Sequence, residues 1–335
     1  MILVAKIRLY IFGLFIGFLS CESPKEYREI QGEAQGSTFS IIYENTANQD
    51  FTESIFEIFH SMDSSMSLWK PESIISRANQ EIDSIEVDSY FKEVFIRSNY
   101  YYELSEGLFD PSIGPLLNRW GLASKKQTTI PNEEEINNLK KLIGFNHWSL
   151  KGNWLFKDNK SIEIDFNAIA QGYTVDVLAE FLEKNGIENY LVEVGGELRT
   201  KGKNSRGEKW TIGIEKPDYN LGGEVNSIEN IISISGKSLA TSGSYRKFIE
   251  TGGKKYSHTI NPKTGRPVEH HMLSVSVITE KAIDADALAT YFMLIGEEKT
   301  LEYANKNGIA IHCIIASESE KYKILESKKW KELKN

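Results

Sequence analysis

Three stretches of the chain repeat apolar residues at the spacing of an amphipathic helix. They predict helices over residues 52–62, 88–104 and 170–185. Gly107 follows the second stretch and Gly186 the third, and glycine is typical of the position just beyond a helix C-terminus. Each of these helices is expected to bury one face.

Shorter apolar or alternating stretches predict strands between and after the helices. They cover residues 38–43, 161–165, 190–194, 198–201, 210–214, 231–235, 275–278 and 309–316. Because strands and helices intermix without strict alternation, the pattern favours an α+β fold, with mixed or antiparallel sheets and packed helices. A chain of 335 residues can build a sizeable core, with room for two lobes in one domain.

The N-terminus has the features of a targeting segment. Lys6 and Arg8 precede an apolar stretch, residues 9–19, which is shorter than the roughly 20 residues of a membrane span and has the length of a signal peptide. The stretch ends in Leu-Ser-Cys21, which resembles the lipobox of bacterial lipoproteins. An ordinary signal peptide with a chance cysteine is the alternative.

These features divide the chain into three parts. We predict a signal peptide over residues 1–20, with a lipid on Cys21, then a linker over 22–35 and one domain over 36–335. The protein would then be lipid-anchored in a bacterial cell envelope, on the extracytoplasmic side of a membrane.

Net charge, basic residues and cysteine count limit the functions that the chain can have. The net charge of −8 argues against a nucleic-acid surface. Basic residues gather over 321–334, but they alternate with Glu and favour a solvated tail. The chain has two cysteines, so a lipid on Cys21 would leave Cys313 without a disulfide partner, as a buried and inert thiol.

One helical run carries candidate chemistry. Asp286 lies among small apolar residues and Thr290 follows it by four, which places a carboxylate and a hydroxyl on one helix face. Hard cations such as Mg²⁺ prefer such oxygen ligands. The alternative is an Asp cap ahead of an apolar helix over 285–295, with Gly296 ending it.

Polar residues also collect at five turns that border the predicted strands and helices. Each alone is consistent with a simple turn, as in the Asn-Pro-Lys-Thr-Gly of residues 261–265. The five groups cover residues 36–38, 66–79, 107–115, 165–173 and 240–265. Their order and number are more specific than any one of them.

Taken together, these motifs resemble those of the ApbE family, the FAD:protein FMN transferases. The matching segments cover nearly all of the chain after its N-terminal segment: 36–40, 66–79, 107–116, 169–176, 189–199, 240–246, 256–268 and 284–290. The resemblance implies an enzyme that binds FAD and Mg²⁺, splits the pyrophosphate and attaches FMN to a Ser or Thr of a partner protein. The acceptor would be an extracytoplasmic flavoprotein subunit of a membrane redox complex.

The resemblance also implies roles for particular residues. The metal ligands would be Asp286, Thr290 and the backbone carbonyl of Ala168, and His258 would accept a proton from the incoming hydroxyl. Trp69 and Phe109 would pack against flavin or adenine rings. The FAD contacts would come from Gln35, Trp69, Leu108, Phe109, Asp110, Asp165, Gln171 and the stretch from His258 to Ile260.

Three positions depart from the family pattern. Gln35 stands where Met is usual, Gln171 where Lys or Glu is common, and Asn261 where Asp is usual. None of them is a predicted metal ligand. Two other functions stay open: hydrolysis of FAD to FMN and AMP by the same site, and passive flavin binding, which has no need for a metal.

Overall fold

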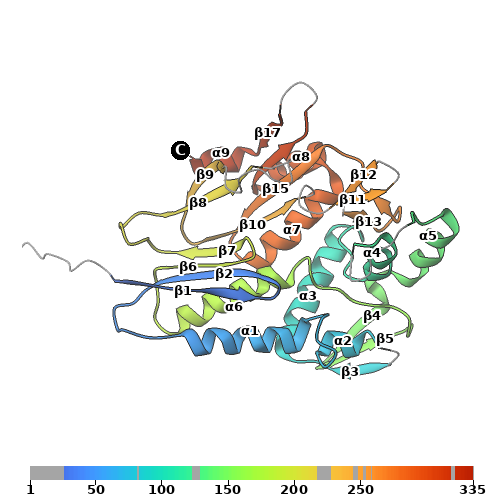
Figure 1. The fold of residues 1–335 in the computed structure, drawn as a ribbon, viewed down its shortest axis with the longest axis horizontal. Coiled ribbons are helices and arrows are strands. Elements are labelled where there is room, and N and C mark those ends of the chain that lie inside the picture. Colours follow the sequence, from blue (N-terminus) through green and yellow to red (C-terminus); the bar gives the residue numbers. More distant parts are fainter. Residues whose placement is uncertain are drawn as a thin grey trace, which may run out of the picture.

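The computed structural model describes residues 26–80, 83–122, 129–216, 228–243, 248–251, 254–257, 259–317 and 321–334. Its centre is an eight-stranded sheet in which every neighbouring pair is antiparallel (Figure 1). In spatial order the strands are β1 (Tyr27–Ala34), β2 (Ser37–Glu44), β6 (Tyr190–Val194), β7 (Glu197–Lys201), β10 (Lys237–Gly243), β15 (Met272–Thr279), β16 (Ala310–Ile315) and β17 (Lys323–Glu326).

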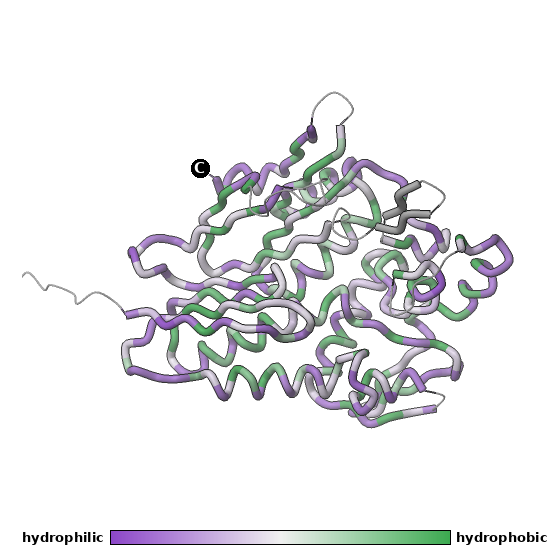
Figure 2. The backbone as a smooth tube through the Cα atoms, in the orientation of Figure 1, coloured by the Kyte–Doolittle hydropathy of each residue, from purple (hydrophilic) through white to green (hydrophobic). Residues whose placement is uncertain are grey.

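The two faces of this sheet are covered differently. Helices α6 (Ala170–Lys184), α7 (Ala282–Ile295) and α8 (Glu297–Asn307) pack on one face. The other face is covered by the β8–β9 hairpin (Trp210–Glu215 and Ile228–Ile234) and helix α9 (Lys328–Lys334). Hydrophobic positions accordingly gather along the central strands and the inner helices (Figure 2).

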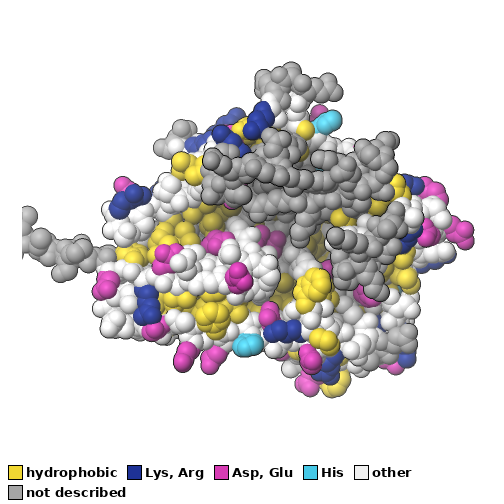
Figure 3. Space-filling view, in the orientation of Figure 1, with side chains coloured by type: hydrophobic (Ala, Val, Ile, Leu, Met, Phe, Trp, Pro, Cys, Tyr) yellow, Lys and Arg dark blue, Asp and Glu magenta, His cyan; other side chains and the backbone are white. Residues whose placement is uncertain are grey.

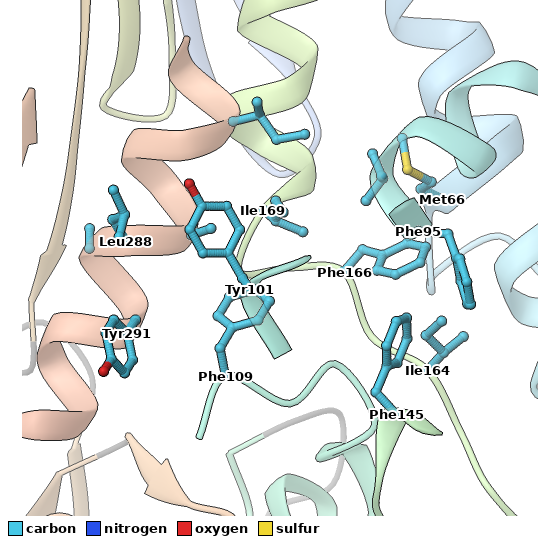
Figure 4. Packing of buried hydrophobic residues seen from close by; sticks show 14 of the residues in the cluster. Met66, Phe95, Tyr101, Phe109, Phe145, Ile164, Phe166, Ile169, Leu288 and Tyr291 are labelled. Carbon is cyan, nitrogen blue, oxygen red and sulfur yellow. The ribbon is translucent and has the colours of Figure 1, made fainter. Parts of the chain in front are cut away.

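A second group of elements adjoins α7. Its largest member is α3 (Ser89–Leu104), which shares a core with α7 and with the small sheet β3 (Ser84–Glu86), β5 (Trp154–Lys157) and β4 (Trp148–Lys151). Figure 4 shows Tyr101 and Phe109 between this group and Leu288 of α7. The other elements are α1 (Thr52–Met66), α2 (Ile74–Ala78), α4 (Gly114–Trp120), α5 (Glu133–Leu139), η1 (Lys140–Leu142), η2 (Phe145–His147), β11 (Phe248–Thr251), β12 (Lys254–Ser257), β13 (Ile260–Asn261) and β14 (Arg266–Pro267).

The α+β prediction is confirmed, and so are the three predicted helices and all but one of the strands. The exception is 161–165, which lies outside the sheets. Its alternation is real, because Ile162 and Ile164 are fully buried. However, the backbone of Ile164 exchanges hydrogen bonds with the Asn79 side chain (2.7 and 2.9 Å), and no strand pairs with it there.

Two predictions made from polar composition are wrong. Residues 27–34 are not linker but the edge strand β1, in which Ile30 is the one buried side chain and Glu29, Gln31 and Glu33 are exposed. The basic C-terminal segment is not a solvated tail, because it forms β17 and α9. Trp330 of α9 is 0% exposed and packs beside His312, with ring centroids 5.3 Å apart.

The features expected of the N-terminal segment remain predictions. The signal peptide and Cys21 lie outside the described residues. Within the described part of the chain, no helix has both the length and the apolar character needed to cross a membrane.

Cys313 is buried, and burial raises the pKa of its thiol to about 12, as expected for an inert cysteine.

The buried C-terminal helix gives a test of the fold. Trp330→Ala should lower the free energy of unfolding by about 3–5 kcal/mol, because it empties a fully enclosed site. Urea denaturation measures the change. Lys331→Ala, at the neighbouring exposed position, is the control and should change stability by less than about 0.5 kcal/mol. Equal effects of the two substitutions would mean that α9 does not pack as described.

Candidate active site

Asp286 lies in the second turn of α7. The helix begins at Ala282, and its first two N–H groups are capped by Asp176 of α6, at 3.0 and 2.9 Å. Asp286 is therefore not the cap of its own helix, and that alternative is excluded. Asp286 and Thr290 instead share one face of α7, as their spacing predicts.

The Asp286 carboxylate meets the first turn of α6. Its Oδ2 accepts a hydrogen bond from the Gly172 N–H at 3.0 Å. Gly172 is the third residue of α6, so its N–H has no carbonyl partner within the helix. Among the described residues, nothing donates to the Ala168 carbonyl. A carboxylate and a free carbonyl therefore lie at the same helix start, as the predicted ligand set requires.

The electrostatics of Asp286 suit a cation. The residue is 6% exposed, and burial raises the pKa of its carboxyl to about 7 against the smaller opposing effect of the Gly172 hydrogen bond. Within the described ranges, no Lys, Arg or His forms an ion pair with it. A bound cation would supply the missing positive charge and favour the ionised carboxylate.

The third predicted ligand completes a set of oxygen donors. Among the described residues, the Thr290 hydroxyl has one weak hydrogen-bond contact, 3.5 Å to the Ser242 hydroxyl of β10. No group of three or more His, Cys, Asp or Glu side chains that could hold a metal occurs in the described part of the chain. One carboxylate, one hydroxyl and one carbonyl is a set that fits Mg²⁺, which keeps several waters, better than it fits zinc.

Glycine lets the two helices approach each other closely. A Cβ on Gly172 would lie 2.4 Å from the Ala282 carbonyl oxygen and 2.8 Å from the Asp286 Cβ. Any side chain at residue 172 would therefore push α7 away. Gly172 is the sequence signal for this contact, because an isolated glycine inside a helical pattern often marks a close approach of another element.

Two ion pairs fix α7 in place. Asp176, 3% exposed as a side chain, accepts a hydrogen bond from Arg199 of β7 at 2.9 Å in addition to the two α7 amides. Burial raises the pKa of Asp176, and its three hydrogen bonds oppose that shift. Asp284, the other acid of the motif, binds Arg97 of α3 through two hydrogen bonds of 2.5 Å. Asp284 therefore faces α3, away from the ligand set.

The β1–β2 and β6–β7 turns reach the same helix start. Gln35, at the tip of the β1–β2 hairpin, donates to the Thr174 hydroxyl at 3.0 Å. Gln171 lies against the β6–β7 turn, so closely that a Cβ on Gly195 would be 1.8 Å from its Nε2. The structure thus brings Gln35, Gln171 and Asp286 to the N-terminal part of α6, which Ala168 precedes.

Two acidic residues lie on loops that touch each other. The Asp165 N–H donates to the Pro111 carbonyl at 2.7 Å, which joins the 107–116 motif to the segment before α6. Asp165 is half-buried between Ile164 and Phe166, which are fully buried and point into the core in Figure 4. Burial raises the pKa of both Asp165 and Asp110, and Asp110 caps its own loop through Ser112.

The two aromatic residues that were predicted to pack against rings of FAD lie in different surroundings. Trp69 is 77% exposed, on a loop in which Ser67 accepts hydrogen bonds from two serine hydroxyls, so its ring is free to stack on a ligand. Phe109 differs from the prediction: it is 2% exposed and packs on Tyr101. Its side chain is core, and only its backbone can line a site. Ile260 is also buried, in a small cluster with Leu116, whereas Leu108 is half-buried.

Other candidate positions lie elsewhere. His258 is outside the described residues. An open hollow of about 860 Å³ is lined by residues of α2, β3 and the β4–β5 hairpin, and one of about 350 Å³ by residues of α1 and the start of α3. None of the predicted site residues lines either hollow. On the face shown in Figure 3, acidic and basic side chains are interspersed over the lower half, with no single-sign patch among the described atoms there.

Comparison with known proteins places this geometry in a family. The sequence model of the ApbE family matches residues 35–315. A FAD:protein FMN transferase of Vibrio cholerae is 35% identical over 305 residues, covering 89% of this chain and 90% of that one. Its counterpart of Haemophilus influenzae is 33% identical over 320 residues, covering 92% of each.

Solved structures agree with the sequences. The flavin transferase ApbE from Vibrio cholerae superimposes with a TM-score of 0.83 at 34% identity, covering 92% of this chain and 100% of that one. The apo form of the Pseudomonas stutzeri flavinyl transferase ApbE has the same TM-score at 30% identity, covering 92% and 97%. The protein is an enzyme of the flavin-transferase class. The chain belongs to the ApbE family, as the motifs predicted.

The close helix contact gives the next test. Gly172→Ala should lower the free energy of unfolding by about 1–3 kcal/mol, because the new methyl group forces α6 and α7 apart. Chemical denaturation measures it. Gly114→Ala is the matched control: its methyl would approach only the flexible Glu163 side chain, at 3.4 Å, and stability should stay within about 0.5 kcal/mol. A stable Gly172→Ala protein would contradict the described helix packing.

Proposed function

We propose that this protein transfers FMN from FAD to a Ser or Thr hydroxyl of a partner protein, with Mg²⁺, and releases AMP. The observation that carries the proposal is the junction of α6 and α7, where buried Asp286 binds the Gly172 amide and leaves the Ala168 carbonyl free. The names of the relatives support flavin transfer from FAD. The chemistry of the three oxygen donors supports the metal.

The ligands of the metal would be Asp286, Thr290 and the Ala168 carbonyl. When bound, Mg²⁺ would offset the charge of the pyrophosphate, which is the main requirement of phosphoryl transfer. Asp286 supplies the only negative charge of the three. The buried surroundings strengthen its attraction for a cation, because water screens it little.

The rest of the site would bind and orient the two reactants. Trp69, exposed on a braced loop, would stack on one ring system of FAD. The acceptor hydroxyl oxygen would bond to the phosphorus of the FMN half as the pyrophosphate P–O bond breaks. AMP would leave with the bridging oxygen, and the hydroxyl proton would pass to His258.

The acceptor and the location are also part of the proposal. The nucleophile belongs to the partner, which by family resemblance would be an extracytoplasmic flavoprotein subunit of a membrane redox complex. A lipid on Cys21 would hold the enzyme near such a partner. Only five residues separate Cys21 from Tyr27, where β1 begins, so the tether would be short.

Asp286 is the decisive residue for a test. Asp286→Ala should reduce AMP release from FAD by about 10²-fold or more, because the cation loses its charged ligand. Asp286→Asn keeps the shape without the charge and should be similarly impaired. Thr290→Ala should be milder, because a water can replace a hydroxyl ligand. The assay follows AMP and protein-bound flavin against Mg²⁺ concentration, with FAD and a candidate acceptor domain.

The test of Asp286 has one control variant and two outcomes that would contradict the proposal. Glu298→Gln removes an exposed carboxylate from the first turn of α8 and should behave as wild type. Free FMN and AMP in equal amounts, with no labelled acceptor, would indicate a hydrolase. Wild-type Mg²⁺ dependence in Asp286→Ala would place the metal elsewhere.

The lipid anchor has its own test. Cys21→Ala should release the protein from membranes or leave its signal peptide uncleaved, because the lipobox would have lost its acceptor thiol. Fractionation and intact mass detect either result. Cys313→Ala, which changes a buried thiol on β16, should stay in the membrane fraction. Unchanged fractionation and mass in Cys21→Ala would refute lipidation.

A further inference from the structure

Gln35 occupies an unusual backbone position. It is the first of two residues that connect β1 to β2, and it has a φ of 53°, followed by Gly36 at 74°. Two-residue hairpins of this kind favour Asn, Asp or Gly at the first position, because other side chains are strained at positive φ. A Gln that keeps such a conformation suggests a role for its side chain.

The orientation of the Gln35 amide follows from its neighbour. The Thr174 hydroxyl donates its only hydrogen to the Ala170 carbonyl at 2.9 Å. Toward Gln35 that hydroxyl can therefore only accept, so the amide nitrogen of Gln35 must face it, at 3.0 Å. The amide oxygen consequently points away from Thr174, and a fully buried Thr174 holds it there.

The amide oxygen itself has no partner. Gln35 Oε1 is buried, and among the described residues no donor lies within hydrogen-bond distance of it. Buried acceptors in proteins are nearly always paired, so this one indicates a donor that arrives with a ligand. Its neighbour Thr174 lies two residues after Gly172, whose amide binds Asp286, in the N-terminal part of α6.

We propose that Gln35 Oε1 accepts a hydrogen bond from an N–H group on one of the two ring systems of FAD and so helps to select that nucleotide. The inference rests on the proposed function. FAD offers two such donors, the imide N–H of the isoalloxazine and the amino group of the adenine. The Met that is usual at this position in the family has no strong acceptor, so the contact would be particular to chains with an amide here.

A double-mutant cycle between the protein and the ligand tests this contact. We would measure dissociation constants by quenching of flavin fluorescence, in the full chain without added Mg²⁺ so that FAD is not turned over. The ligands are FAD, FAD methylated at the isoalloxazine N3, and FAD dimethylated at the adenine amine. The proteins are wild type, Gln35→Met and the control Gln31→Met, which replaces an exposed glutamine of β1.

One of the two methylated ligands should bind wild type and Gln31→Met about 3- to 10-fold more weakly than FAD does, as expected for one lost hydrogen bond. The same ligand should bind Gln35→Met within about 2-fold of FAD, and which ligand it is identifies the donor. If both methylations weaken wild type and Gln35→Met equally, Gln35 accepts no hydrogen bond from FAD, while the transferase proposal stands. If wild type does not bind FAD, both proposals fall.

Discussion

The carboxylate of Asp176 is the constraint on which the rest of the site depends. It joins three elements by accepting two amide hydrogens from the start of α7 and one from Arg199 of β7. The Asp176 side chain is 3% exposed and that of Arg199 16%, and loss of Arg199 would leave the Asp176 carboxylate buried without an opposite charge. With α7 held against α6 in this way, Asp286 has one place to lie, beside the amide of Gly172.

This arrangement separates two tasks within one short motif. Asp284 and Asp286 are two residues apart on α7, yet Asp284 pairs with Arg97 of α3 and Asp286 has no basic partner in the described part of the chain. The charge of Asp284 is neutralised in an ion pair that joins α7 to α3. The carboxyl of Asp286 has no such partner, so burial raises its pKa, and a bound cation would favour the ionised form again. A helix turns by about 100° per residue, so a separation of two sends the side chains to opposite sides.

The sequence predicted what depends on local periodicity. Helix α6 and the shared face of Asp286 and Thr290 follow from residues three and four apart, and the motifs sufficed to identify the family. The capping of α7 could not be predicted, because Asp176 and Ala282 are 106 residues apart and no pattern links them. Nor could the burial of Phe109, since an aromatic residue in a polar turn is equally consistent with core and with a binding surface.

The hydrogen bond between Gly172 and Asp286 also bears on how the chain folds. It closes a loop of 114 residues, and the entropy of that closure must be met before the contact stabilises anything. Contacts of such long range slow folding, and α7 is made late in synthesis. The first turn of α6 is therefore synthesised long before Asp286, the residue that binds its Gly172 amide. A nascent chain that ends before α7 lacks Asp286 and Thr290, so the proposed cation site can form only when almost all of the chain has been made.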